Sequence, residues 1–386
     1  MKILMLAPEP FFQPRGTPFS EYFRIKALSD LGHRVDLITY HLGEGVKINN
    51  LKILRIPDLF YIKKIKIGPS WAKIPLDFLL FLKALFQLTK KSYDLIFSHE
   101  EAAFLGVILA KIWRVPHLYD MHSSLPQQLE NFNFSRSKTL KATFLWLERF
   151  ILKNSQAVIV ICLDLLEKVK KEGYEKKVIL IENFLDFNDQ SFSEDQIKQK
   201  HLEFAPEGEK IILYTGNFES YQGIPLLLEA AARMKEKVVF LLVGGNSYEI
   251  AKMKQKAKAL TVSDRVIFTG KVAPSMVPLY ISLADVLVSP RISGTNTPLK
   301  IYSFMKSGKP LVATDLWTHT QVLSLENSVL VKPDPQSLAD GLIFALSDEK
   351  ARVRAKFCKE LADREYTHSR YLEKISLSLQ MASNIS

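Results

Sequence analysis

The sequence predicts an α/β fold of two Rossmann-like domains that face each other across a cleft. At 386 residues, the chain is too long for one ordinary core and suits two domains of about 100 to 200 residues each. Short apolar runs, rich in leucine and β-branched residues, alternate with helical patterns, as they do in doubly wound parallel sheets. A polar, charged stretch divides this alternation into two series.

The first series fills the N-terminal half of the chain. Its expected strands are residues 2–7, 34–40, 51–56, 95–98, 117–121 and 157–161. Its expected helices are residues 20–31, 75–91, 102–112 and 137–154. Ser98 and Glu101 match a capping box at the start of the third helix, and His99 and Glu100 between them are candidates to line the cleft.

The second series follows a stretch with few large apolar residues. Its expected strands are residues 210–215, 238–244, 266–269, 284–289, 310–314 and 329–332. We therefore expect an N-terminal domain at residues 1–185, a linker and peripheral segment at 186–208, a C-terminal domain at 209–365, and a final helix at 366–386 that packs back on the first domain.

Composition restricts the protein class and its location. A hydrophobic content of 47% with 24% charged residues is typical of folded globular proteins. Cys162 and Cys358 lie far apart and form no ligand pattern, which fits a reducing compartment. The apolar N-terminus is too short for a secretory signal, and no apolar stretch reaches the roughly 20 residues of a membrane span. We expect a cytoplasmic protein, with a peripheral position on the inner face of the membrane as the alternative.

The net charge of +11 favours an anionic partner, either a phosphate-bearing substrate or an acidic membrane surface. Nucleic acid is disfavoured because the basic residues are dispersed and no stacking-plus-basic motif is present. Lys63, Lys64, Lys66 and Trp71 precede an apolar helical pattern, a composition typical of an interfacial membrane anchor. An ordinary buried helix beside a solvated basic loop explains the same residues equally well.

Ligands bind beyond the carboxyl ends of parallel strands, so the loops there are the candidate sites. In the second series, Thr297 is a plausible N-cap with Pro298 at the first helical position, and the helix stops at Gly308. Lys300 then falls in the first turn, and Arg291 ends the preceding strand. The pair favours phosphate binding, against the alternative of two solvated surface charges.

Two loops of the first series are further candidates. Gly16 lets backbone approach a ligand, and Thr17 with Pro18 resembles a helix cap and first turn. Asp120 and His122, two residues apart on an extended segment, point to the same side, so the carboxylate would fix the imidazole tautomer while the imidazole contacts substrate. A plain turn and a loop hydrogen-bond network are the respective structural alternatives.

Several motifs together carry a family resemblance. They are the Pro14 to Pro18 loop, Gly32-His-Arg-Val35, Tyr119-Asp-Met-His122, Ile181-Glu-Asn-Phe-Leu-Asp186, Tyr214-Thr-Gly-Asn-Phe218, Phe268-Thr-Gly270, and Gly294 through Pro310. In this order, and over essentially the whole chain, they resemble glycosyltransferase family 4, whose members are retaining enzymes of the GT-B fold.

The resemblance implies a nucleoside diphosphate sugar as donor, no metal and no cofactor. It makes Asp120 and His122 the catalytic pair, with His122 on the transferred sugar. The implied donor-binding residues are Gly16, Thr17, Gly216, Asn217, Gln222, Gly270, Val272, Arg291, Thr295, Asn296, Thr297, Lys300 and Ser303.

The chain departs from the family pattern at four of these positions. Thr295 and Ser303 replace two glutamates that are seven residues apart in the family, and Asn217 and Gln222 replace an arginine and a lysine of the first loop. We expect the two cations of the opposite loop to supply the missing charge, which makes the chain a divergent subfamily.

The expected function is transfer of a sugar, with retention, from a nucleoside diphosphate sugar to a glycan or lipid-linked acceptor in cell-envelope polysaccharide or glycolipid synthesis. One alternative is a sugar-nucleotide epimerase of the same architecture. The other is a catalytically degenerate subunit that binds a sugar nucleotide or a membrane surface. The absence of the family's two glutamates is the reason for this alternative.

Overall fold

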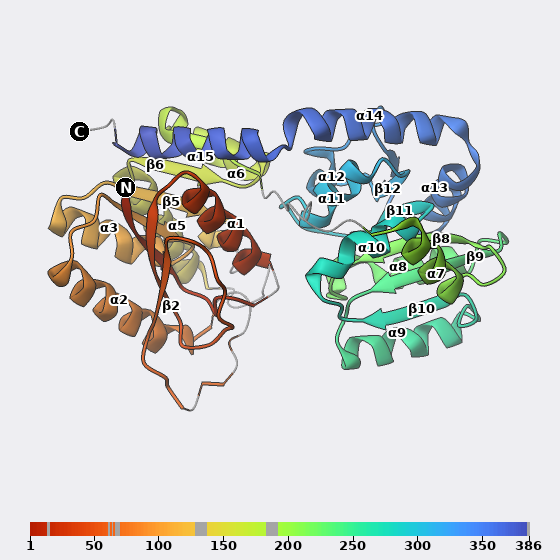
Figure 1. The fold of residues 1–386 in the computed structure, drawn as a ribbon, viewed down its shortest axis with the longest axis horizontal. Coiled ribbons are helices and arrows are strands. Elements are labelled where there is room, and N and C mark those ends of the chain that lie inside the picture. The colour runs from red at the N-terminus through yellow and green to blue at the C-terminus, as the bar shows by residue number, and fades with distance from the viewer. Residues whose placement is uncertain are drawn as a thin grey trace. The chain divides into compact units, whose positions relative to one another are not determined.

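The computed structural model describes residues 1–13, 16–60, 62–63, 65, 70–127, 137–182 and 192–383. The chain divides into two compact units, one of Met1–Phe184 with His368–Ser386 and one of Leu185–Thr367. We call them unit 1 and unit 2 (Figure 1). Pro14, Arg15, Lys64, Lys66 and residues 183–186 of the expected hinge lie outside the described residues.

Unit 1 is built on a parallel sheet of seven strands. They are β1 Lys2–Ala7, β2 Arg34–Thr39, β3 Leu51–Arg55, β4 Leu95–His99, β5 His117–Met121, β6 Ala157–Val160 and β7 Val178–Leu180. Their order is β3-β2-β1-β4-β5-β6-β7, and every pair is parallel. Strands β1 to β3 follow one another toward one edge of the sheet, and β4 to β7 follow one another toward the other edge. The strand order therefore changes direction between β1 and β4, and the crevice for a ligand lies at the carboxyl ends of these two strands.

Helices cover both faces of this sheet. They are α1 Gly16–Asp30, α2 Lys73–Lys90, α3 Ala102–Trp113, α5 Lys138–Asn154, α6 Leu163–Lys171, the short 3-10 turn η1 Glu175–Lys177, and α15 His368–Ser383. The apolar sides of α2, α3 and α5 share a core with one face of the sheet. Helices α1 and α15 lie side by side on the other face, where α15 packs on β5 and β6 (Figure 1).

Unit 2 repeats the architecture on a six-stranded parallel sheet. Its strands are β8 Lys210–Thr215, β9 Val238–Val243, β10 Val266–Gly270, β11 Val286–Ser289, β12 Leu311–Thr314 and β13 Val329–Val331, in the order β10-β9-β8-β11-β12-β13. Its helices are α7 Glu194–Phe204, η2 Ser220–Gln222, α8 Ile224–Ala231, α9 Ser247–Ala259, η3 Pro274–Met276, α10 Val277–Leu283, α11 Leu299–Ser307, α12 Trp317–Thr320, α13 Pro335–Ser347 and α14 Glu349–Glu365.

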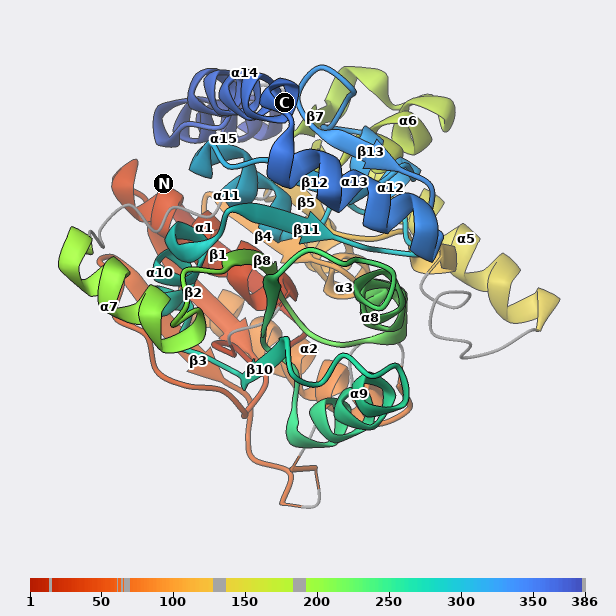
Figure 2. The ribbon, with the colours of Figure 1, turned by 90° about the vertical axis from the view of Figure 1, so that its right-hand side faces the viewer.

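Two separate cores hold the layers of unit 2 together. Helices α8, α9 and α13 share one core with the sheet, and α7, α10, α11 and α14 share the core on its opposite face (Figure 2). The switch in strand order falls between β8 and β11. None of the described helices in either unit combines the length and the apolar character that crossing a membrane requires.

The predicted α/β class and the parallel sheets are confirmed, and each predicted strand has a counterpart that differs by at most two residues at an end. Strand β7, Val178–Leu180, was not predicted, although it belongs to a short apolar run. Helix α1 begins at Gly16, so the prediction that Thr17 caps it is wrong, and both Thr17 and Pro18 lie in its first turn.

The predicted capping box at Ser98 is also wrong. Strand β4 continues through His99, and the hydroxyl oxygen of Ser98 lies 3.1 Å from Nε2 of the buried His117. Helix α3 begins only at Ala102, and its N-cap residue Glu101 makes no side-chain capping bond. Pairing in the sheet has overridden the local capping preference, because a buried strand residue satisfies its backbone groups in the ladder.

One fully buried guanidinium ties the layers of unit 1 together. Arg24 of α1 donates from Nε to Oδ2 of Asp120 in β5 at 2.9 Å. It also donates from Nη1 to the hydroxyl of Tyr371 in α15, and from Nη2 to the carbonyl of Ile181 after β7, both at 3.0 Å. Arg24 therefore links helices on one face of the sheet to two of its strands, and Asp120 balances its charge.

We expect Asp120→Asn to lower the free energy of unfolding by about 3–5 kcal/mol, because removal of one partner leaves a buried cation without its counter-charge. Urea denaturation of the purified protein measures the change. Asp264→Asn is the matched control, because it makes the same carboxylate-to-amide change at an exposed position. A loss no larger than that of the control would show that the ion pair does not hold the layers together.

Candidate functional site

Three glycines form the carboxyl edge of the unit 2 sheet. Gly216 follows β8, Gly244 follows β9 and Gly270 ends β10, and all have positive φ angles. The Gly244 amide donates to the Gly270 carbonyl at 2.8 Å, and a Cβ atom on Gly244 would lie 1.9 Å from the Gly216 carbonyl oxygen. Only glycine fits this packing, and the result is an edge where a ligand can approach the backbone closely.

Two cations stand beside this edge. Lys300 of α11 places Nζ 3.7 Å from the ring centroid of Tyr214 and donates to Oε1 of Gln222 at 3.3 Å. A Cβ atom added to Gly216 would lie 3.3 Å from the same Nζ. Burial lowers the pKa of Lys300 well below its usual value, and the charge of Arg291 lowers it further.

Arg291 completes the pair of cations at the end of β11. Its Nη1 donates to the Asn296 carbonyl and to the Thr318 hydroxyl, both at 2.7 Å, and its guanidinium lies 5.0 Å from the Tyr221 ring centroid. Its buried Nε has no hydrogen-bond partner in the described part of the chain. Neither cation pairs with a carboxylate there, although buried charges are normally paired. The arrangement favours an anionic ligand.

The loop between β11 and α11 is held from behind. Gln321 donates to the Thr295 carbonyl at 2.5 Å, and Thr318 donates to the Asn296 carbonyl at 2.6 Å. The prediction that Thr297 caps α11 is wrong, because the N-cap residue is Pro298 and no side chain caps the helix. The Thr297 hydroxyl is buried and finds no partner among the described residues. It is therefore available to a ligand at the start of α11.

Several predicted donor residues meet in unit 2. The contacts above join Gly216, Gln222, Arg291, Asn296 and Lys300, and Thr297 follows Asn296 in the same loop. The Gly223 backbone that follows Gln222 fits against the Pro290 carbonyl, where a Cβ atom would lie 1.8 Å from the oxygen. This packing docks the β8 loop on the β11 loop.

Other predicted donor residues have a looser connection to this group. Asn217 has an exposed side chain, and its carbonyl accepts from the Tyr214 hydroxyl at 2.6 Å. Val272 packs its side chain against the core beneath α10. Thr295 and Ser303 are half-buried, and within the described part of the chain their side chains make no hydrogen bond to either cation.

Sequence reasoning missed Gly244. It also missed Thr318 of α12 and Gln321, the C-cap residue of α12, whose side chains hold the loop between β11 and α11. The Gly244-Gly245 pair directly after the apolar run of β9 was a usable signal for the first. No sequence signal pointed to the bracing side chains, because their partners are backbone carbonyls some 20 residues or more away in the chain.

The second group of candidate residues lies at the carboxyl end of the unit 1 sheet. Asp120 Oδ2 lies 3.4 Å from His122 Nε2 and 3.6 Å from His99 Nδ1, and the two imidazole nitrogens are 3.3 Å apart. All three side chains are buried. The structure thus joins the predicted pair and adds His99.

The surroundings shift the pKa of each of these three groups differently. Burial alone would lower the pKa of His122, but the Asp120 carboxylate beside it raises the pKa above the usual value. Burial lowers the pKa of His99 to about 3, so His99 is neutral. The Arg24 guanidinium, with His122, keeps the pKa of Asp120 low despite burial. The cluster therefore favours a charged His122 beside a carboxylate.

Three further carboxyl groups surround His122. Burial raises the pKa of Glu100, whose side chain accepts from the Ser123 hydroxyl, to about 7. Burial raises the pKa of Glu21 well above its usual value, and the neighbouring Glu9 carboxylate raises it further. His99, Asp120 and His122 also have ligand atoms close enough to hold a metal, but the Arg24 bond to Asp120 opposes a second cation.

The remaining predicted residues of unit 1 are Gly16 and Thr17, at the start of α1. Gly16 is exposed, and a Cβ atom there would meet no other atom of the described chain within 4 Å. Packing among the described residues does not require glycine at this position.

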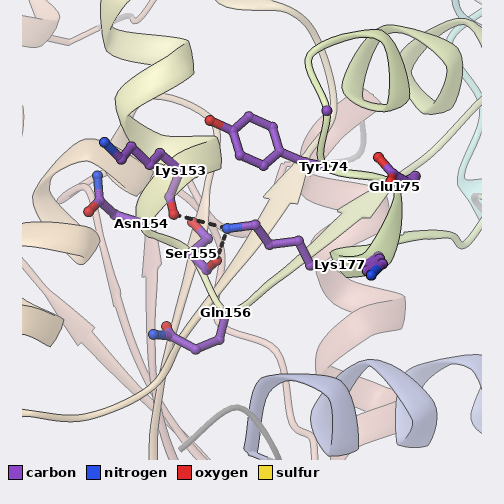
Figure 3. A pocket seen from close by; sticks show the side chains of 9 residues that line it. Lys153, Asn154, Ser155, Gln156, Tyr174, Glu175 and Lys177 are labelled. Carbon is purple, nitrogen blue, oxygen red and sulfur yellow. Dashed lines mark hydrogen bonds between the residues drawn. The ribbon is translucent and has the colours of Figure 1, made fainter.

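A surface pocket of about 520 Å³ lies elsewhere in unit 1 (Figure 3). It is at the amino ends of β6 and β7, where Lys177 Nζ donates to the carbonyls of Lys153 and Ser155 at 2.9 Å. This is the edge opposite to the loops described above. Because parallel sheets bind ligands at their carboxyl ends, the pocket is not a candidate for the same site.

Comparisons with known proteins agree on one kind of enzyme. The sequence model described as Glycosyltransferase Family 4 matches residues 24–189, and the one described as Glycosyl transferases group 1 matches residues 209–348. The α-monoglucosyldiacylglycerol synthase of Streptococcus pneumoniae is 26% identical over 329 residues, which cover 81% of this chain and 71% of that protein. The phosphatidyl-myo-inositol mannosyltransferase of Mycobacterium tuberculosis is 23% identical, over 96% of this chain and 94% of that protein.

Solved structures share the fold. Sucrose-phosphate synthase from Thermosynechococcus elongatus matches with a TM-score of 0.81 and 21% identity, over 100% of both chains. The Anabaena protein HepE, solved in complex with UDP, matches with a TM-score of 0.77 and 19% identity, over 98% of this chain and 100% of HepE.

We expect Lys300→Met to raise the free energy of unfolding of the ligand-free protein at neutral pH, because the change removes a buried cation that lacks a carboxylate. The pKa of Lys300 is lower in the folded than in the unfolded state, so the unfolded state binds more protons between the two values. As the pH rises through this window, the free energy of unfolding of the wild type should therefore increase relative to that of the variant.

Urea denaturation from about pH 7 to about pH 10 measures both effects. Lys356→Met, at an exposed position of α14, is the matched control. If the wild type and the Lys300→Met variant have the same stability and the same pH dependence, Lys300 is not a destabilising buried cation.

Proposed function

Because the chain belongs to glycosyltransferase family 4, we propose that it transfers a sugar, with retention, from a nucleoside diphosphate sugar to a glycan or lipid-linked acceptor. The donor would bind at the carboxyl edge of the unit 2 sheet. The acceptor would bind at the corresponding edge of unit 1.

The observation that carries the donor site is a pair of half-buried cations that have no carboxylate partner among the described residues. Arg291 and Lys300 stand beside a glycine edge that gives backbone groups access to a ligand. A diphosphate would supply the missing negative charge. As the donor bond breaks, negative charge grows on the leaving diphosphate, and cations already in position stabilise it without rearrangement. The complexes of HepE with UDP and with UDP-glucose support the choice of ligand class.

In unit 1, we assign His122 and Asp120 to the transferred sugar. A charged imidazole donates hydrogen bonds from both ring nitrogens, and one of them lies beside Asp120. We propose that the imidazole donates to a sugar hydroxyl that carries partial negative charge. Asp120 then keeps the imidazole charged and oriented, and Arg24 holds Asp120 in place.

The acceptor is proposed from the relatives. Two proteins similar to this chain carry names that denote synthesis of glycolipids, a glucosyldiacylglycerol and a phosphatidyl-inositol mannoside. We propose a lipid-linked or glycan acceptor of the cell envelope, and a cytoplasmic protein that works at the inner face of the membrane. The net charge of +11 is compatible with such a surface.

Calorimetric titration with UDP, GDP, ADP and dTDP tests the donor site. We expect one nucleotide to bind, and Lys300→Ala to weaken that binding roughly ten- to hundredfold, because a hydrogen bond to a charged group is lost. Lys356→Ala, at the exposed surface of α14, should bind as the wild type does. Absence of binding by all four nucleotides would contradict a working donor site.

Replacement of His122 by asparagine separates chemistry from donor binding. We expect kcat for sugar transfer to fall roughly a hundredfold or more, as for loss of a group that acts in the transition state. The Kd of the nucleotide should remain unchanged, because its proposed site lies in the other unit. Transfer of radiolabelled sugar to a membrane extract measures kcat, and an unchanged value would remove His122 from the mechanism.

Product analysis with and without acceptor distinguishes the remaining alternatives. A transferase needs the acceptor for turnover, whereas an epimerase converts the donor alone. Nucleotide binding without turnover of any donor would favour the degenerate subunit, for which Thr295 and Ser303 at the positions of the family's glutamates are the reason.

A further inference from the structure

Helix α2 of unit 1 carries apolar residues on two opposite sides. Leu76, Leu80, Ala84 and Leu88 form one stripe at four-residue spacing and are buried against the sheet. A second stripe at the same spacing is offset by two residues, or about 200° around the helix. It is made of Ile74, Phe78, Leu82 and Phe86, whose side chains are 58%, 60%, 41% and 57% exposed.

Neighbouring segments extend this apolar surface. Trp71, just before α2, is 70% exposed. Ile112 at the end of α3 is 60% exposed, and Trp146 on α5 is 59% exposed. Helix α3 packs against both α2 and α5, so the three helices form one continuous layer. Scattered apolar side chains are normal at a surface, but a contiguous group of large ones marks an interaction site.

The charge on the same layer is all of one sign. The three helices contain only two acidic residues, and both bind inward: Asp77 accepts from the Tyr40 hydroxyl, and Glu148 accepts from the Leu125 amide. The lysines on their outer sides are Lys83, Lys90, Lys111, Lys138, Lys141 and Lys153, whereas Arg149 is paired with Glu172. Lys90 Nζ lies 4.1 Å from the Phe86 ring centroid, so charge and apolar surface are interleaved.

We infer that this basic apolar face, the outer surface of α2, α3 and α5, docks on an anionic lipid bilayer. Large aromatic and aliphatic side chains enter the boundary between headgroups and acyl chains, and lysines around them reach the lipid phosphates. A second copy of the chain is a poorer occupant, because a two-fold contact through this face would bring its cations against one another.

The consequence of docking rests on the proposed function: unit 1 would meet a lipid-linked acceptor in the membrane. The docking itself depends on exposed side chains that are outside the proposed donor and catalytic residues. Binding to vesicles and binding of nucleotide can therefore succeed or fail independently.

Flotation of the whole protein with vesicles tests the inference. One set of vesicles is phosphatidylcholine with about one third phosphatidylglycerol, and the other is pure phosphatidylcholine. We expect binding to the first set and about tenfold or weaker partitioning into the second. The double variant Phe78→Ser/Phe86→Ser should lose about tenfold or more in partitioning, because two large apolar side chains no longer enter the lipid.

Two further variants complete the design. Lys83→Gln/Lys90→Gln should weaken binding about fivefold for each lysine and only to the anionic vesicles. Leu325→Ser/Val353→Ser removes two equally exposed apolar residues of unit 2, each 62% exposed, and should bind as the wild type does. Circular dichroism and thermal melting confirm that each variant is folded.

Several outcomes would overturn the inference. They are no wild-type flotation, equal binding to both vesicle types, or an equal loss in the unit 2 control. A dimer detected by light scattering that Phe78→Ser/Phe86→Ser dissociates, without vesicle binding, would assign the face to a second copy instead. Calorimetry with UDP on the same samples reports on the donor site, so failure of the proposed function is recognised separately.

Discussion

The buried Arg24 guanidinium organises unit 1 around its candidate catalytic group. Its three donors reach a strand carboxylate, a backbone carbonyl and the hydroxyl of Tyr371, which lies 347 residues further along the chain. Asp120 therefore serves two partners with one oxygen, since the atom that accepts from Arg24 also lies beside His122. The same ion pair that holds the layers together fixes the charge and orientation of the imidazole.

The two units have opposite electrostatic character at the edges of their sheets. In unit 1, the carboxyl groups of Glu9, Glu21 and Glu100 gather near His122, and burial raises the pKa of each. In unit 2, Arg291 and Lys300 lack carboxylate partners among the described residues, and burial lowers the pKa of both. A group-transfer enzyme needs this division if a charged leaving group stays on one unit while hydroxyl-bearing groups are held on the other.

Sequence reasoning found every strand except β7 but misplaced several helix starts, and its site residues remain predictions. Apolar runs identified the strands because a strand buried on both faces must be apolar throughout. The capping prediction at Ser98 failed because this residue belongs to a strand and contacts His117, which local sequence cannot show. The one at Thr297 failed because α11 begins one residue later, with Pro298 as its N-cap. The membrane-anchor hypothesis pointed to the basic loop before α2, whereas the structure places the exposed apolar stripe on the helix itself.

The sequence by itself determined the α/β class, the two series of strands, and the strand ends and following segments that carry Arg291, Lys300, Asp120 and His122. Periodicity and loop position are local properties, so they can be read along the chain. Only the tertiary structure decided that Arg24 binds Asp120. It also decided that, among the described residues, the two cations have no carboxylate partner and one side of α2 is uncovered. Burial, charge pairing and exposure depend on which distant segments come together, and that information exists only in the folded chain.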